Sequence, residues 1–101
     1  MSVVTGIVLV TSLWHKDKDC VVLANDWIEK EGFTPLTVGL EERCCKGKHP
    51  QIALMGGGYN YFPHERFEQF VQALPWEGGV HLMIRTEDGG IRSWTKQSDY
   101  L

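Results

Sequence analysis

The residues most able to bind a metal or to attack a substrate are three cysteines and a histidine. Cys44 and Cys45 are adjacent, His49 follows in the same polar segment, and Cys20 stands apart. Zinc sites usually combine two ligand pairs of the C-x-x-C or H-x-x-x-H type, and no second pair matches this one. A nucleophilic cysteine also needs a base and an orienting group, which the surrounding sequence does not show. We therefore predict no catalytic residue, no metal and no cofactor, while metal binding or redox activity at Cys44, Cys45 and His49 stays open.

The odd number of cysteines also indicates the compartment. A disulfide between Cys44 and Cys45 would be strained because the two residues are adjacent, so a reducing environment fits best. The apolar segment over residues 1–14 lacks the basic start of a signal peptide, and it is too short and too rich in serine and threonine to span a bilayer. We expect a cytoplasmic protein without a membrane partner.

Three consecutive glycines, Gly56, Gly57 and Gly58, stand shortly before a predicted helix. Such a turn can bind phosphate through backbone amides at the helix N-terminus, but the lysine and the serine or threonine of a P-loop are absent. Pro63 also removes an amide hydrogen that a phosphate would need. We predict instead that the glycines form a sharp corner, and that nearby rings reach the surface because they cannot all enter one small core. The predicted binding residues at this corner are Tyr59, Asn60, Tyr61 and His64.

Apolar periodicity predicts the secondary structure. Runs rich in β-branched residues indicate strands over residues 3–13, 36–40, 51–55, 78–86 and 90–97. The first helix is predicted to begin near Asp17 or Asp19, either of which can cap it, and to end at Gly32. The second is predicted to begin at Pro63 and to end before Pro75. Each helix has one apolar stripe, formed in the first by Cys20, Leu23, Ala24, Trp27 and Ile28 and in the second by Phe67, Phe70, Val71 and Leu74.

The order of these elements is strand, helix, strand, strand, helix, strand, strand. This order predicts the α+β class, in the form of a ferredoxin-like split βαβ sandwich that makes a single domain over residues 1–101. Its sheet would be mainly antiparallel, with about five strands and with two helices on one face. The strand over residues 3–13 is predicted to lie near the centre, because a nearly continuous apolar run is typical of a strand buried on both faces.

The sheet face without helices is the second candidate binding surface. Because side chains alternate along a strand, His81, Met83 and Arg85 are predicted to lie on it. If the hairpin at EDGG keeps the register, Arg92 and Trp94 lie beside them, whereas a one-residue slip would reverse their face. Methionine, tryptophan and arginine are favoured at interface centres, although the same side chains could form only a stabilising cross-strand ladder. The predicted binding residues of this face are Met83, Arg85, Arg92 and Trp94.

Composition and charge bear on the partner. The 101 residues include 10 Lys+Arg and 13 Asp+Glu, which gives a formal net charge of -3. This acidic balance argues against nucleic acid, whose binding depends on clustered cations. We therefore interpret the chain as a small, non-enzymatic protein that binds another protein, as inhibitors, immunity proteins and phage-type antagonists do. A homodimer through the open sheet face is a further form of this interpretation.

Two alternatives to protein binding remain. The chain could be a small-ligand-binding domain or a small enzyme, with a pocket near the Gly56 to Gly58 turn and beside the loop that holds Cys44. A ligand would then raise the thermal stability by mass action. A nucleic-acid surface would instead use a set of basic side chains, namely Arg43, Lys46, Lys48 and Arg92.

Overall fold

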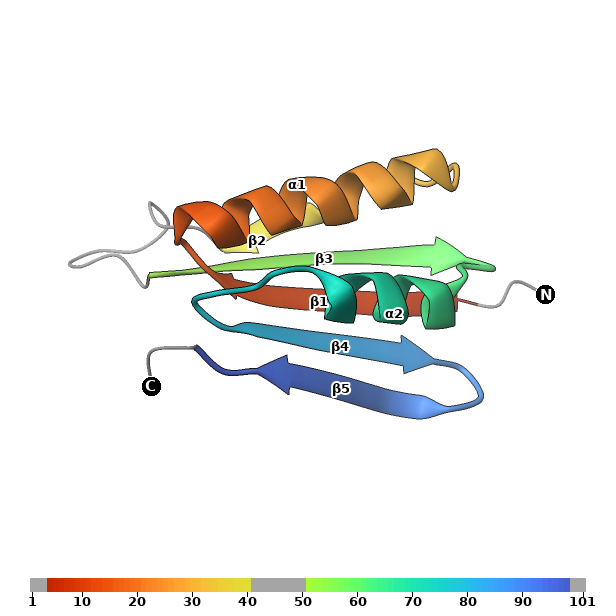
Figure 1. The fold of residues 1–101 in the computed structure, drawn as a ribbon. Coiled ribbons are helices and arrows are strands. Elements are labelled where there is room, and N and C mark those ends of the chain that lie inside the picture. Colours follow the sequence, from red (N-terminus) through yellow and green to blue (C-terminus); the bar gives the residue numbers. More distant parts are fainter. Residues whose placement is uncertain (1–3, 41–50, 99–101) are drawn as a thin grey trace.

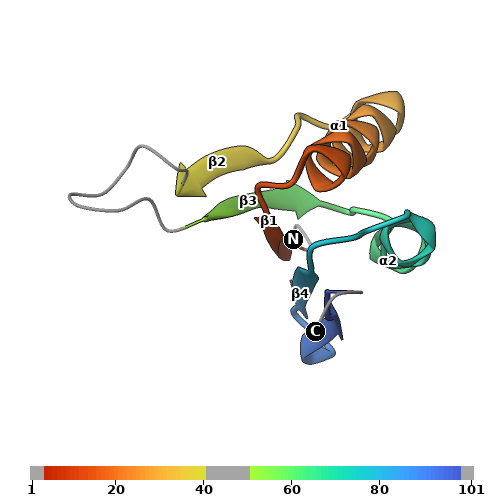
Figure 2. The ribbon, with the colours of Figure 1, turned by 60° about the vertical axis from the view of Figure 1, so that its left-hand side comes forward.

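The computed structural model describes residues 4–40 and 51–98, and it confirms the α+β class. Five antiparallel strands form one sheet, and both helices lie on the same side of it (Figure 1). The turned view in Figure 2 shows the same two layers. The elements are β1 (Val4–Ser12), α1 (His15–Lys30), β2 (Thr37–Leu40), β3 (Ile52–Asn60), α2 (His64–Ala73), β4 (Val80–Thr86) and β5 (Gly90–Lys96).

The strands lie in the order β2-β3-β1-β4-β5, and each neighbouring pair is antiparallel. β1 is the central strand, as its apolar run predicts, because it pairs with β3 on one side and with β4 on the other. Its side chains alternate in burial. Ile7 and Leu9 are buried under the helices, whereas Val8 and Val10 point to the other side and are only partly buried. One side of the sheet is therefore the covered side.

The core lies between this covered side and the two helices. The buried residues of α1 include Cys20, Ala24 and Ile28, which follow one another at helical spacing. Leu23 was predicted to share this stripe. It is 46% exposed, because it lies about 100° around the helix axis from the centre of the stripe that Cys20, Ala24 and Ile28 form. Neither helix in the described ranges is long and apolar enough to cross a membrane. The sheet, α2 and the connections supply the other buried core residues: Ile7, Leu9, Leu36, Met55, Tyr59, Phe62, Phe67, Val71, Trp76, Val80, Leu82 and Ile84.

A buried carboxylate joins the start of α1 to the connection between α2 and β4. Asp17 accepts the amide hydrogens of Glu77 and Gly78, each at an N···O distance of 2.7 Å, and the hydroxyl hydrogen of Ser12. These charge-assisted hydrogen bonds offset the cost of burying the carboxylate. The prediction that Asp17 or Asp19 caps the helix is wrong, because α1 begins before both residues and has no side-chain cap.

The three glycines lie within β3 and pair with β1, so the predicted corner at this position is wrong. Gly57 faces the helices, where an added Cβ atom would approach the Tyr59 ring to 2.7–3.0 Å. The ring lies over the glycine and stacks on Phe62, with 4.9 Å between the ring centroids. Gly57 therefore provides the space in which Tyr59 packs, and the chain turns only after Asn60.

The β4–β5 hairpin has a turn of three residues, 87–89, and Gly90 follows it with a φ of 69°. In this register Trp94 is opposite Leu82, and Arg92 is opposite Ile84 on the covered side. The predicted placement of Arg92 and Trp94 beside Met83 on the uncovered face is therefore wrong. A turn shorter by one residue would have produced the predicted pairing, since a shift of one residue reverses both faces of a strand.

Two glycine substitutions test this packing. Gly57→Ala is expected to lower the free energy of unfolding by about 1–3 kcal/mol, because the Tyr59 ring must move and is held in place by its neighbours. Gly58→Ala is the matched control, because an added Cβ atom there meets nothing within 4 Å. It should leave the stability unchanged or raise it by up to about 1 kcal/mol. Urea unfolding measures both, and equal losses would contradict the packing described.

Candidate binding surface

The side of the sheet opposite the helices, called the open face below, is the main candidate surface. No described element lies over it (Figures 1 and 2). Alternate residues of four strands form it: Val4, Gly6, Val8 and Val10 of β1; Ile52, Leu54, Gly56, Gly58 and Asn60 of β3; His81, Met83 and Arg85 of β4; and Ile91, Ser93 and Thr95 of β5.

The centre of the open face is a continuous apolar patch. Val8 is opposite Met83 of β4, and Val10 is opposite Leu54 of β3. These four side chains are partly exposed, and Ile91 on β5 is 64% exposed. Monomeric soluble proteins rarely leave large contiguous apolar patches in water, so this patch is the first candidate for a contact site.

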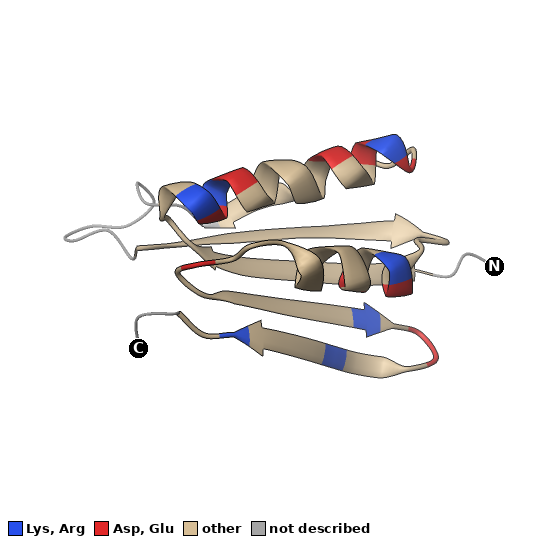
Figure 3. Cartoon of the chain, in the orientation of Figure 1, with Lys and Arg blue, Asp and Glu red and all other residues tan. Residues whose placement is uncertain are grey.

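The open face carries almost no charge. Among the strand residues described on this face, Arg85 is the single Lys, Arg, Asp or Glu residue. Figure 3 shows most of the other charged residues on the helices and in the turns. His81 is held across the strands, because its Nδ1 atom lies 2.6 Å from Oγ1 of Thr95. Electrostatic attraction at this surface therefore depends on a single guanidinium group.

Three glycines leave part of the open face without side chains. Gly6 and Gly58 are opposite each other on β1 and β3, and Gly56 lies on the same side two residues along β3. An added Cβ atom at Gly58 meets nothing within 4 Å, and one at Gly6 would lie 3.9 Å from Cβ of Arg85. We call this bare backbone the glycine platform. An aromatic ring from another molecule can lie flat on it, as rings cover strand glycines within sheets.

A groove of about 440 Å³ adjoins the open face where β1 ends and β4 begins. Its lining includes Val10, Ile52 and His81 together with Trp14, which lies between β1 and α1. Trp14 is 43% exposed, so it enlarges the aromatic and apolar surface at this end. The sequence predictions missed Trp14 because it belongs to neither periodic segment. The available signal was a large aromatic residue directly after a predicted strand.

The structure separates the four residues predicted for the sheet surface. Met83 and Arg85 lie on the open face as expected. Arg92 lies on the covered side, where its Nη2 atom donates to Oε1 of Glu68 in α2 at 3.2 Å. Trp94 is partly buried against the core. These two residues therefore lie on the side of the helices and do not contribute to the open face.

Tyr59, predicted to be a surface ring, is buried. Its hydroxyl donates to the backbone carbonyl of Thr34 at 2.7 Å, and Phe33 packs against its ring edge with 5.5 Å between centroids. The residue closes the end of the core, so its position does not fit the predicted binding role. Asn60 and Tyr61 are exposed as predicted, and Tyr61 has a φ of 54°, which is uncommon for a residue with a side chain.

A depression of about 330 Å³ brings Tyr61 and His64 together with Thr86, Glu87 and Asp88 at the β4–β5 turn. The Nδ1 atom of His64 is buried and has no hydrogen-bond partner among the described residues. The two carboxylates and the phenol hydroxyl offer hydrogen-bond acceptors. This depression therefore fits a small cationic or polar group, and it does not fit a phosphate.

Metal binding or redox activity remains an alternative for three residues that lie outside the described ranges: Cys44, Cys45 and His49. Within the described ranges, no group of three His, Cys, Asp or Glu side chains could hold a metal ion. Cys20 is buried. Burial is the larger cause that raises the pKa of its thiol, and the negative charge of Asp17 raises this pKa further. Cys20 therefore stays protonated at neutral pH and is not an activated nucleophile. The other cations of the possible nucleic-acid patch also lie outside the described residues: Arg43, Lys46 and Lys48.

The pH dependence of the free energy of unfolding tests the structural role of Tyr59. Tyr59→Phe is expected to lower the free energy of unfolding at neutral pH by about 1 kcal/mol, because the Thr34 carbonyl loses its donor. Burial raises the pKa of Tyr59 above its ordinary value, so the phenol ionises first in the unfolded chain. The wild type therefore loses stability as the pH rises past about 10, and the difference between the two proteins narrows. Urea unfolding at several pH values measures this difference, and a constant difference would contradict the assignment.

Comparisons with protein-family models, with curated proteins and with solved structures gave no match to this chain. The functional conclusion therefore rests on the geometry of the described residues. The open face combines partly exposed apolar side chains from three neighbouring strands of the sheet.

Proposed function

We propose that the protein is non-enzymatic and acts by binding another protein through the open face. The observation that carries this proposal is the apolar patch of Val8, Val10, Leu54 and Met83 on a side of the sheet that no described element covers. Binding of this kind fits inhibitors, immunity proteins and phage-type antagonists, which work by occupying a partner. A cytoplasmic location is part of the same proposal and rests on the odd number of cysteines.

The proposal includes a ferredoxin-like split βαβ arrangement. Two β-α-β units interleave, because β3 lies between β1 and β2 while β1 lies between β3 and β4. The result is the order β2-β3-β1-β4, to which β5 adds a fifth strand. Both helices occupy one side in such an arrangement, so the other side is available for association.

The residues of the open face support an expectation about the chemistry of its partner. Aliphatic side chains fit the apolar patch, and an aromatic side chain fits the glycine platform. A carboxylate can pair with Arg85, whose guanidinium group would fix its orientation by two parallel hydrogen bonds. We therefore expect a partner surface that combines an exposed aromatic ring, aliphatic groups and at least one acidic side chain.

A second copy of the chain fits this description less well than a different protein. The strand residues described on the open face include no Phe, Tyr, Trp, Asp or Glu, so two such faces would supply no carboxylate and no ring other than the imidazole of His81, which is already bonded to Thr95. The five strands offer roughly 600 Å² per face, given about 4.8 Å between strands and about 3.3 Å per residue. A specific interface takes about 800 Å² from each partner. The contact must therefore extend past the strands, and the groove beside Trp14 offers that extension.

The alternative of a small-ligand site or enzyme near the three glycines has less support. The glycines belong to a strand, and the depression at Tyr61 and His64 lies beyond them. Its described lining contains no cysteine or serine that His64 could activate as a nucleophile. Protein binding through the open face therefore accounts for more of the surface.

Met83→Glu is expected to weaken partner binding at least about 30-fold, because a buried charge would stand in the centre of the contact. Leu23→Glu is the matched control: it places the same charge on exposed apolar surface of α1, and binding should not change. A partner captured from native lysate and then purified is titrated with each variant by calorimetry. Circular dichroism and thermal unfolding confirm that both variants stay folded.

Equal affinity for the wild type and Met83→Glu would contradict the proposal, as would a loss of binding in Leu23→Glu alone. Light scattering after size exclusion supplies a further outcome. If the chain forms a dimer that Met83→Glu dissociates, the partner is a second copy. Arg85→Glu should weaken binding to an acidic partner about tenfold and reduce its dependence on salt.

A further inference from the structure

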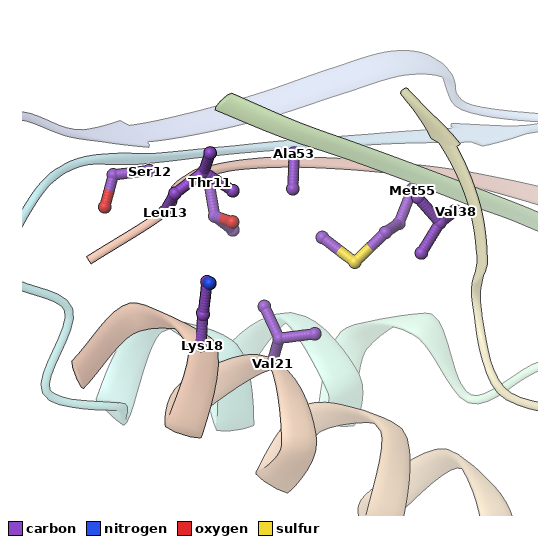
Figure 4. A pocket seen from close by; sticks show the side chains of 8 residues that line it. All are labelled: Thr11, Ser12, Leu13, Lys18, Val21, Val38, Ala53 and Met55. Carbon is purple, nitrogen blue, oxygen red and sulfur yellow. The ribbon is translucent and has the colours of Figure 1, made fainter. Parts of the chain in front are cut away.

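A separate cavity of about 200 Å³ lies on the covered side of the sheet, between α1 and the strands β1, β2 and β3. Figure 4 shows its lining from close by. Val21 of α1, Val38 of β2 and Met55 of β3 form apolar walls, and Ala53 leaves room at the back because its side chain is one methyl group. Lys18 and Val38 are exposed, so the cavity opens to solvent and a small molecule can enter it.

The cavity has one polar end. In Figure 4 the ammonium group of Lys18 and the side chain of Thr11 both point into the gap between α1 and the sheet. Lys18 is exposed, like Lys16, but no ion pair joins it to another described residue, whereas Lys16 lies 3.8 Å from a Glu77 carboxylate oxygen. Asp17 does not line the cavity; its carboxylate accepts hydrogen bonds from Ser12 and from the backbone amides of Glu77 and Gly78.

We infer that this cavity binds a small apolar carboxylate, whose hydrocarbon part lies between α1 and β3 and whose carboxylate pairs with Lys18. One cation suits a singly charged carboxylate. A phosphate, which carries more charge and needs more donors, does not match walls that are mostly apolar. The hydroxyl of Thr11 can donate a second hydrogen bond to the carboxylate.

The volume sets the size of the ligand. A cavity of about 150 Å³ holds a benzene ring, so about 200 Å³ accommodates roughly eight to nine non-hydrogen atoms. Hexanoate and benzoate have this size. The site and the open face lie on opposite sides of the sheet, so ligand binding here neither requires nor excludes the protein contact proposed above.

The test uses hexanoate and benzoate as probes, with hexanol and acetate as controls at constant ionic strength. Hexanol has the hydrocarbon part of hexanoate without its negative charge, and acetate has the negative charge without the long hydrocarbon part. Hexanoate and benzoate are expected to raise the melting temperature in a saturable way that follows mass action. Neither control should do so over the same concentration range. Amide NMR spectra should show the largest shifts at Val21, Ala53 and Met55.

Two substitutions locate the site. Lys18→Gln should weaken hexanoate binding at least tenfold, whereas Lys30→Gln, an exposed cation in the last turn of the same helix, should leave it unchanged. Ala53→Leu fills the cavity and should abolish binding; if that variant fails to fold, Lys18→Gln still decides the question. Equal effects of hexanol and hexanoate would overturn the inference. So would full binding by Lys18→Gln, the absence of any saturable shift, or NMR shifts confined to Val8 and Met83.

Discussion

The alternation of side chains along β1 is the constraint on which the rest of the structure depends. This strand is hydrogen-bonded on both sides, so Ile7 and Leu9 must enter the core while Val8 and Val10 face away from it. A helix with its side chains is about 10 Å wide, and five strands at about 4.8 Å spacing span roughly 24 Å. Two helices therefore suffice for one side of this sheet and leave nothing in the described chain for the other. An uncovered apolar side follows directly from the number of elements.

The same alternation explains why one glycine triplet serves both sides of the sheet. Gly57 points to the covered side, where its missing side chain makes room for the Tyr59 ring. Gly56 and Gly58 point to the open face, where their missing side chains leave the backbone bare beside Gly6 and Val8 of β1. One segment of β3 therefore provides both the space in which Tyr59 packs and the flat backbone surface on which a ring from a partner can lie. A binding surface on a rigid sheet loses little conformational freedom when a partner associates with it.

Local patterns predicted the elements well, and contacts between distant residues decided what local patterns could not. The central position of β1 and the two helices followed from apolar periodicity, which is a property of each segment alone. The face of Arg92 and Trp94 depended on the number of turn residues in the hairpin, and a difference of one residue reversed it. A corner was expected at the glycines because glycine runs usually mark turns. Their role depends on the Tyr59 ring, whose hydroxyl bonds to Thr34 in a distant part of the sequence. The cavity beside Lys18 joins three strands and a helix, and no local pattern indicates it.

The accessibility of methyl groups to a soluble paramagnetic agent tests the central claim most directly. In methyl NMR spectra of the free protein, such an agent should strongly broaden the signals of Val8, Val10 and Leu54, which lie on the open face. The signals of Ile7, Leu9 and Leu82 should stay sharp, because these residues are buried under the helices. If Val8 and Val10 were as protected as Leu9, the sheet would be covered on both sides, and the surface proposed for partner binding would not exist.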